Sequence, residues 1–409
     1  MLFNQSLYSF FMGGVAMALP FIVRTSLINY EIVNGKNHFF VFVAFLSVIL
    51  FGFTKRVATS VVLLVGAVVC HAYLNQMDYL QGSVIYQFIC FCAGAMLLVQ
   101  AISNFKPDDN RTIFNALAIS ALLQSGWVFG EEFFELFFAD YYNFFGGSYV
   151  TVNSHLATVS HVTAPSVGVL SNSNYSGSLL AICSIALLRK RWIWTASIPI
   201  IALYILGATL PIVSLFFGII IYSLVKADIK KSIIIDSMAI VTASLVILSI
   251  VNSDNGALGS SVRISAWTDT VNNLFIGKEV VAHASTEKDA KKTSVTVGGQ
   301  YLAGHGLGYF ATMSRFFIKE QKSTKGKVWR QVHNEYLEFI YTFGLIGFVY
   351  IFIAFRSIPF VDSLDPVLAA MLGVIVFNSA GHFLFHVAPT AFIAIMLIGL
   401  LYNQKAKYE

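Results

Sequence analysis

Long, uninterrupted runs of apolar residues recur along this chain, and short polar segments separate them. A helix needs about 20 apolar residues to cross the hydrocarbon core of a bilayer. Only helices and closed barrels satisfy their backbone hydrogen bonds within lipid, and continuous rather than alternating runs favour helices. The pattern predicts twelve membrane-spanning helices, at residues 6–23, 37–53, 57–73, 83–102, 112–130, 170–188, 192–208, 210–225, 232–251, 335–355, 364–382 and 385–402.

The composition agrees with a protein that lies mostly in lipid. Hydrophobic residues make up 57% of the 409 residues and charged residues only 11%, whereas a soluble domain carries about 25% charged residues. The predicted fold class is therefore all-α: a polytopic transmembrane helix bundle of about twelve spans with a long, partly helical loop on one side.

The basic residues predict the orientation of the chain. With the amino terminus in the cytoplasm, thirteen of the 26 Lys and Arg residues fall in cytoplasmic segments, and only Arg24 and Lys36 fall in short loops on the other side. Long loops do not count in the positive-inside rule, so the remaining eleven in the long loop carry no weight. Both termini are therefore predicted to be cytoplasmic.

The predicted spans divide the chain into five regions. They are N-terminal transmembrane helices (residues 1–130), an aromatic loop with an expected amphipathic helix on the membrane surface (131–169), further transmembrane helices (170–251), a long hydrophilic loop (252–334) and C-terminal transmembrane helices with a cytoplasmic tail (335–409). No region outside the membrane is large enough for a catalytic core of its own. A catalytic site would therefore lie at the outer mouth of the bundle.

The tenth predicted span starts with His333, Asn334 and Glu335, an unusually polar beginning for a membrane helix. One interpretation is that these groups only satisfy the free backbone N–H groups of the helix start. The other is that they belong to a site, because a histidine exchanges protons near neutral pH. Gly344 and Gly347 are expected on one helix face, where another helix can approach closely and hold the helix start in place.

Arg263 is a second candidate, and on a helix it shares a face with Trp267. A guanidinium forms two parallel hydrogen bonds with a phosphate. The alternative is a tryptophan anchored at the membrane interface beside an ordinary surface arginine. Further along the loop, Lys325, Lys327 and Arg330 form a positive patch just before the histidine-led span.

Two other polar groups stand at the outer ends of predicted spans. His382 and His386 have the i, i+4 spacing of a helical metal site, but no third ligand is evident, so they either line the entrance of a site or serve helix packing. Asn172 and Asn174 start the sixth span, either as caps or as part of a site.

Three motifs in this order resemble the superfamily of O-antigen ligases and O-antigen polymerases. They are "HNEYLEFIYTFGLIGF" at 333–348, "RISAWTDTVNNLFIG" at 263–277 with "GHGLGYF" at 304–310, and "GVLSNSNYSGSLLA" at 168–181. The resemblance covers about residues 165–355, and the first half of the chain matches only in general character.

This resemblance implies a GT-C-like membrane enzyme of lipopolysaccharide biosynthesis. It implies transfer of a glycan from undecaprenyl pyrophosphate to a hydroxyl of lipid A-core, on the periplasmic face of a bacterial inner membrane. It also implies that Arg263 binds the pyrophosphate and that His333 is the general base; if Glu335 is the base, His333 binds phosphate instead. The other residues assigned to substrate binding are Asn334, Arg330, Arg315, Asn174, His382 and His386.

The chain departs from the family at the turn between the seventh and eighth spans. The family has an arginine there that binds the donor, whereas this chain has Thr209, Leu210 and Pro211. Arg315 or Arg330 is a candidate for the missing charge. We expect no metal, no cofactor and no nucleic-acid partner; the expected partners are the lipid-linked donor, the acceptor glycan and membrane lipid.

Two alternatives stay open from the sequence. A repeat-unit polymerase would use the same donor site and a growing glycan as acceptor. A transporter of lipid-linked glycan or solute would suit twelve spans equally well, although transporters usually show repeated halves and a charged site at the midplane.

Overall fold

The computed structural model describes residues 5–21, 32–52, 66, 82–106, 109–133, 168–170, 173–189, 193–227, 261–276, 278–282, 293–297, 300–307, 309–310, 314, 317–318, 332–356, 364–382 and 384–404. The predicted spans 57–73, apart from Gly66, and 232–251 lie outside these residues. So does most of the aromatic loop 131–169, and with it the expected amphipathic helix.

Helices make up almost all of the described chain. They are α1 (Gln5–Ala18), η1 (Leu19–Phe21), α2 (Ile32–Phe51), α4 (Gly82–Asn104), α5 (Asn110–Phe133), α8 (Ser173–Ser184), η3 (Ile185–Arg189), α9 (Ile193–Ile205), α10 (Thr209–Lys226), α12 (Ser261–Ile276), α14 (Glu335–Arg356), α15 (Pro366–Ser379), η5 (Leu384–His386) and α16 (Ala388–Gln404).

Three stretches within these helices are long and apolar enough to cross a membrane: Gln87–Asn104, Asn110–Phe133 and Thr209–Lys226. The prediction of a helical protein with membrane-crossing helices is confirmed at that level. The number of twelve spans and the GT-C-like arrangement stay predictions.

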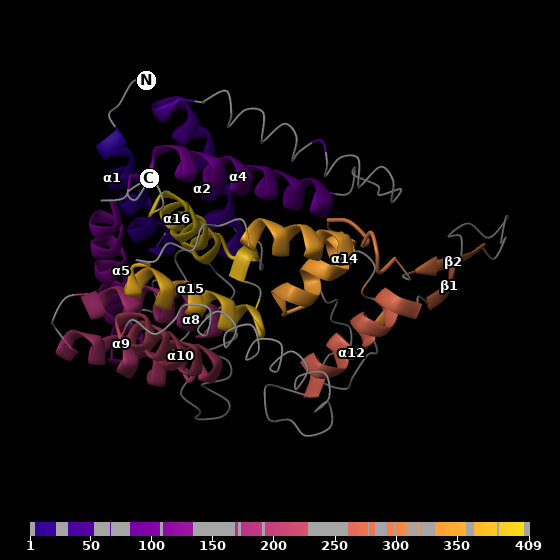
Figure 1. The fold of residues 1–409 in the computed structure, drawn as a ribbon. Coiled ribbons are helices and arrows are strands. Elements are labelled where there is room, and N and C mark those ends of the chain that lie inside the picture. Colours follow the sequence, from indigo (N-terminus) through magenta and orange to yellow (C-terminus); the bar gives the residue numbers. More distant parts are fainter. Residues whose placement is uncertain are drawn as a thin grey trace.

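The helices pack into a bundle with a continuous apolar core. In this bundle α10 packs along α15, α1 packs against α5, and α4 contacts both α2 and α16 (Figure 1). The contact between α10 and α15 is close because Gly218 faces Val374 and Ala370, and any Cβ at position 218 would clash with Val374. This contact holds α10 against α15, whose end, Ser379, lies beside the candidate site.

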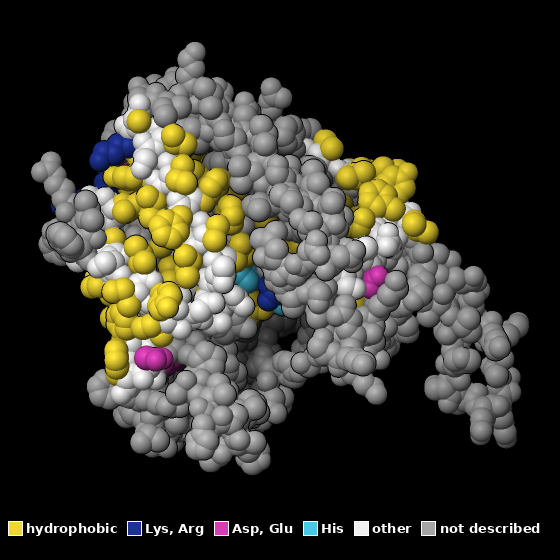
Figure 2. Space-filling model, turned by 90° about the horizontal axis from the view of Figure 1, so that it is seen from below, with side chains coloured by type: hydrophobic (Ala, Val, Ile, Leu, Met, Phe, Trp, Pro, Cys, Tyr) yellow, Lys and Arg dark blue, Asp and Glu magenta, His cyan; other side chains and the backbone are white. Residues whose placement is uncertain are grey.

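The outside of the bundle is also apolar. Phe10 on α1 is 70% exposed and Ile49 on α2 is 66% exposed, and apolar side chains spread over the described part of the face in Figure 2. An exposed apolar surface of this kind is unusual in a soluble monomer. It is compatible with a surrounding of lipid.

The start of α2 differs from the sequence prediction. Lys36, expected in a short loop, lies within α2, is almost fully buried, and donates a hydrogen bond from Nζ to the carbonyl oxygen of Pro20 at 2.6 Å. Next to it, the side-chain oxygen of Asn37 accepts a hydrogen bond from the backbone N–H of Ala388 at 3.2 Å. These two contacts fix the start of α2 against η1 and α16.

The long loop also contains a two-stranded antiparallel sheet, which the sequence did not predict, within an otherwise helical fold. Strand β1 (Lys278–Ala282) pairs with β2 (Thr293–Val297), with Val280 opposite Val295. Strand β1 contains two valines, and β2 contains two valines and two threonines, residues that fit a pleated surface. The sheet and α12 project from one side of the bundle, and α14 lies between them and the bundle (Figure 1).

The helix α14 is broken in the middle, at Gly344. This residue has φ 69° and ψ −174°, which are not helical values. In an unbroken helix the N–H groups of Leu345 and Ile346 would donate to the carbonyls of Tyr341 and Thr342. Here they donate instead to two carbonyls of the turn before the glycine-rich segment, those of Tyr301 (2.9 Å) and Leu302 (3.2 Å).

The glycine-rich segment completes this exchange. The N–H groups of His305 and Gly306 donate to the carbonyls of Tyr341 and Thr342, at 2.8 and 2.9 Å, so the backbone of residues 301–306 is inserted into the break. Gly304 lies so close to Gly344 that a Cβ on either would clash with the other backbone. The predicted continuous span 335–355 is therefore wrong.

The expectation that Gly344 and Gly347 share a face for helix packing is also wrong. Gly344 contacts the backbone of the loop rather than another helix. Among the described residues, the atoms nearest to a Cβ at Gly347 would belong to Phe343 and Phe339 of its own helix.

A second, smaller apolar core lies under the long loop. It joins Trp267 and Leu274 of α12 to Phe310 of the glycine-rich segment and to Leu337 and Tyr341 of α14. The first half of α14 therefore belongs to this outer core. Its start, where the predicted chemistry lies, is held between the outer core and the bundle.

Candidate functional site

His333 lies immediately before α14 in a strained backbone conformation. Its φ of 60° is the only positive φ of a non-glycine residue within the described ranges. Such a conformation costs of order 1–3 kcal/mol and persists only where the surroundings hold it. The direction of this side chain is therefore determined by its neighbours.

Both neighbours of His333 are buried and hydrogen-bonded. The carbonyl of Val332 accepts a hydrogen bond from the indole N–H of Trp267 at 2.7 Å, and the N–H of Val332 donates to Glu338 at 3.0 Å. On the other side, the amide of Asn334 donates to the carbonyl of Ala380 at 2.9 Å and accepts from the N–H of Leu337 at 3.0 Å. Asn334 is thus the N-cap of α14 and a link to the end of α15.

Arg263 reaches the same place from α12. Its Nη1 lies 3.4 Å from the carbonyl oxygen of Gly381, in the turn after α15. Trp267, one helical turn further on, is only 4% exposed and packs in the outer core. The interpretation of Trp267 as an anchor at the membrane interface is therefore wrong, because its ring is buried within the protein.

Two histidines whose pKa is lowered by the charge of Arg263 are neutral imidazoles at neutral pH. Burial is the main cause that lowers the pKa of His333 to about 3, and the positive charges of Arg263 and His386 act in the same direction. Burial, Arg263 and His333 likewise lower the pKa of His382, in the turn after α15, to about 3. The site therefore combines one permanent cation with two uncharged imidazoles.

His382 is the deeper of these two histidines. It is 1% exposed, and among the described residues neither ring nitrogen has a hydrogen-bond partner. The ring of Tyr175 on α8 stands edge-on to it, with the ring centroids 6.4 Å apart. The hydroxyl of Ser379, three residues earlier, is also buried without a partner in the described structure.

His386 takes a different position, between two carboxylates. Its Nδ1 lies 3.4 Å from Glu335 and its Nε2 lies 3.2 Å from Glu338. Burial lowers the pKa of His386, but Glu338 and Glu335 together raise it well above its usual value. His386 is therefore a charged link between η5 and α14. His382 and His386 do not lie on one helix, as their i, i+4 spacing predicted, because α15 ends at Ser379.

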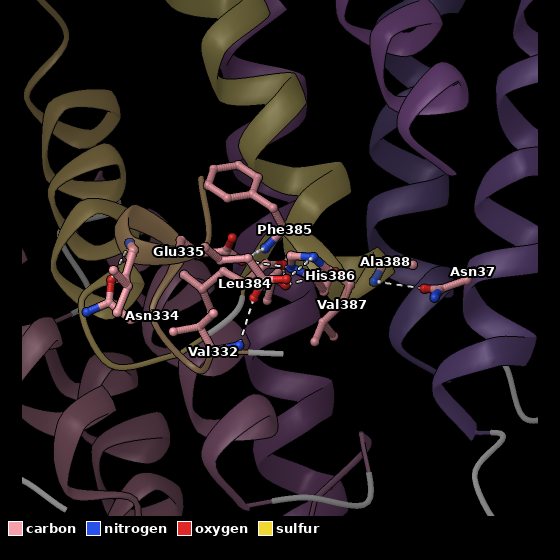
Figure 3. Close-up of polar contacts among 12 residues, drawn as sticks. Asn37, Val332, Asn334, Glu335, Leu384, Phe385, His386, Val387 and Ala388 are labelled. Atoms are coloured by element: carbon pink, nitrogen blue, oxygen red, sulfur yellow. Dashed lines mark hydrogen bonds and ion pairs between the residues drawn. The ribbon is translucent and has the colours of Figure 1, made fainter. Parts of the chain in front are cut away.

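Glu335 is occupied by this link. Its carboxylate accepts the backbone N–H of Phe385 at 2.6 Å as well as facing His386, and Figure 3 shows it directed toward η5 while Asn334 points to the opposite side. This geometry favours a supporting part for Glu335 over that of a free base.

The remaining predicted residues are placed as follows. Asn174 is the second residue of α8, and its carbonyl accepts a hydrogen bond from Ser178 at 2.8 Å. The next residue, Tyr175, has the ring contact with His382. Arg315, Arg330 and Asn172 lie outside the described residues.

The structure thus brings together residues that are far apart in the sequence: Arg263, His333, Asn334, Glu335, His382 and His386. Figure 2 shows histidine and basic side chains close to one another in a hollow of the molecular surface. The sequence analysis missed Glu338, Tyr175 and Ser379. The spacing of Glu338 from Glu335 was a usable signal, because residues i and i+3 share a helix face.

Within the described ranges, no group of three or more His, Cys, Asp or Glu residues has the arrangement of a metal site. The sequence matches no model of a known protein family and no curated protein. A functional conclusion must therefore come from the chemistry of the site.

Proposed function

We propose that the chain transfers a glycan from a lipid-linked diphosphate to an acceptor hydroxyl at the outer surface of the membrane, as an O-antigen ligase does. The observation that carries this proposal is the convergence of Arg263, His333 and His382 at one end of a membrane helix bundle. A cation beside neutral proton acceptors suits a reaction in which an anion leaves and a hydroxyl attacks.

Arg263 would stabilise the leaving group. The diphosphate gains negative charge as the bond to the sugar breaks, and a fixed cation near this charge lowers the barrier. Arg263 is held in position because α12 is packed into the outer core through Trp267. Among the described residues, the carbonyl of Gly381 is the one hydrogen-bond acceptor of Arg263, which leaves most of the guanidinium donors for phosphate oxygens.

The turn at Thr209–Pro211, which lacks the arginine of the resembled family, lies next to this position. The side chain of Leu210 packs against Gly381, whose carbonyl faces Arg263. Arg263 is therefore a candidate for the charge that this turn does not provide, besides Arg315 and Arg330.

His333 would take the proton of the acceptor hydroxyl. In the free protein its pKa of about 3 makes it a weak base, with Arg263 among the causes. A bound diphosphate adds negative charge beside the same guanidinium, and negative charge raises the pKa of a nearby imidazole. His333 would therefore become an effective base only after the donor has bound, which limits wasteful transfer to water.

A gene-deletion strain that carries variants of this chain tests the proposal. His333→Ala and Arg263→Ala should abolish attached surface polysaccharide on a gel, while His38→Ala and Arg111→Ala, at exposed positions, should not. Immunoblots of membrane fractions establish that all four variants are made and inserted. Normal polysaccharide in both site variants would overturn the proposal.

The same strain distinguishes the acceptor. If the chain is a ligase, the deletion removes all attached O-antigen, and chains accumulate on the carrier lipid. A single attached repeat unit in the deletion strain would instead show that the acceptor is a growing glycan and that the chain is a polymerase.

A further inference from the structure

The polar residues at the outer end of α15 fall into two groups. Both side-chain groups of Asn378 are hydrogen-bonded: its amide nitrogen donates to Ser214 on α10 at 2.6 Å, and its oxygen accepts from Ser178 on α8 at 3.3 Å. Its carbonyl also accepts the backbone N–H of His382 at 2.9 Å. This network joins three helices and fixes the end of α15.

The second group, Ser379 and His382, lies in the next turn of chain and is not satisfied by the protein. Both side chains are at most 2% exposed, and the Ser379 hydroxyl and both His382 ring nitrogens lack partners among the described residues. A buried polar group without a partner costs about 1–3 kcal/mol, and native proteins rarely leave such groups unpaired. Because Asn378 beside them is hydrogen-bonded, the unpaired groups of Ser379 and His382 are candidates for contact with a ligand.

The surroundings indicate what kind of ligand would satisfy them. A neutral imidazole offers one donor and one acceptor, and a hydroxyl offers both. A phosphate has only acceptors at its oxygens when ionised, so it would leave the acceptor nitrogen unpaired. Arg263, close enough to lower the pKa of His382, would repel a metal cation. Sugar hydroxyls donate and accept, and therefore match this pair.

We propose that Ser379 and His382 form a buried subsite that binds hydroxyl groups of the donor sugar next to the diphosphate. This inference rests on the proposed function. The deeper position of His382, on the bundle side of Arg263, assigns it to the donor, while the more exposed His333 faces the acceptor.

The test measures binding to the purified full-length chain in detergent. The probes are undecaprenyl diphosphate alone and the same lipid diphosphate carrying N-acetylglucosamine, N-acetylgalactosamine or galactose. We expect the wild type to bind at least one glycosylated probe more tightly than the bare one. His382→Leu and Ser379→Ala should each weaken that probe about 3- to 10-fold, the effect of one or two lost hydrogen bonds.

The bare diphosphate is the control for the fold. Its affinity should be unchanged in His382→Leu and Ser379→Ala, and His382→Gln, which keeps a donor and an acceptor, should recover part of the sugar-dependent affinity. Arg263→Ala should weaken the bare and the glycosylated probes alike.

The outcomes separate the two proposals. If the wild type binds the bare and all glycosylated probes equally, or if His382→Leu and Ser379→Ala weaken the bare probe as much as the glycosylated one, the subsite is refuted and the proposed function stands. If the wild type binds no probe, the proposed function fails, and this inference fails with it.

Discussion

The indole N–H of Trp267 donates a hydrogen bond to the carbonyl of Val332 over 2.7 Å. This single contact links α12, which carries Arg263, to the residue that precedes His333. The two candidate groups, 70 positions apart in the sequence, are therefore held by one buried tryptophan, and the mutual position of cation and base depends on it.

Trp267→Phe should lower the proposed transfer activity as well as the stability of the fold. The phenylalanine ring keeps most of the apolar contact, but the buried Val332 carbonyl loses its donor, which costs about 1–3 kcal/mol of stability. We expect the transfer rate to fall at least about 10-fold, because a small displacement of the base from its reactive position slows proton transfer. Tyr341→Phe, which removes a 2.7 Å bond to Asn273 in the same core, is the matched control; an equal rate loss there would contradict the assignment.

The strained backbone at His333 gives a separate prediction about stability. Glycine adopts a positive φ without steric cost, so His333→Gly should be at least as stable as His333→Ala, with a difference of up to about 1 kcal/mol, and both should be inactive. Chemical unfolding in detergent measures this. If the alanine variant is clearly the more stable, the φ of 60° is not maintained in the folded protein.

The link between His386 and its two carboxylates should make stability depend on pH. The pKa of His386 is raised in the folded protein, so its charge stabilises the fold fully below the unfolded value of about 6.5 and progressively less as pH rises through the raised pKa. At pH 6 the free energy of unfolding of the wild type should exceed that of His386→Gln by about 1–2 kcal/mol. The difference should shrink by pH 9, and a difference that grows with pH would be the opposite result.

His382→Leu should not destabilise the protein at pH 7 and should raise the free energy of unfolding by up to about 1–2 kcal/mol, because it removes buried polar atoms without partners. The stability advantage of His382→Leu over the wild type should grow as pH falls below about 6.5. Below this pH His382 is protonated in the unfolded chain but, with a pKa of about 3, stays neutral in the folded one. Asn378→Leu is the control and should destabilise, because it removes the hydrogen bonds that join α15 to Ser214 on α10 and to Ser178 on α8. Equal destabilisation by both would show that His382 is a structural residue.

Gly344→Ala should severely disrupt the outer core. A Cβ at this position would clash with the carbonyl of Leu302, and its φ of 69° disfavours any other residue. We expect the free energy of unfolding to fall by at least about 3 kcal/mol. Gly126→Ala in α5, where a Cβ would meet nothing within 4 Å, should be neutral or mildly stabilising.

The apolar pattern was sufficient to predict most of the helices that the structure describes, because each run can satisfy its backbone in lipid only as a helix. It was also possible to select Arg263 and His333, since charged or ionisable groups at the ends of apolar runs are rare. The pairing of His386 with Glu338 depends on how α14 meets η5, and the break at Gly344 depends on carbonyls some 40 residues earlier. Neither is encoded in local spacing, and the valine-rich strands were hidden within a polar loop.

The exchange of hydrogen bonds at Gly344 separates the two halves of α14 mechanically. In a continuous helix, an extra residue inserted near the membrane end would turn everything beyond it by about 100°. Here an insertion after Ile346 would rotate only the half that ends at Arg356, because Leu345 and Ile346 are anchored to residues 301 and 302. The second half of α14 can therefore vary in length and register without moving the imidazole of His333.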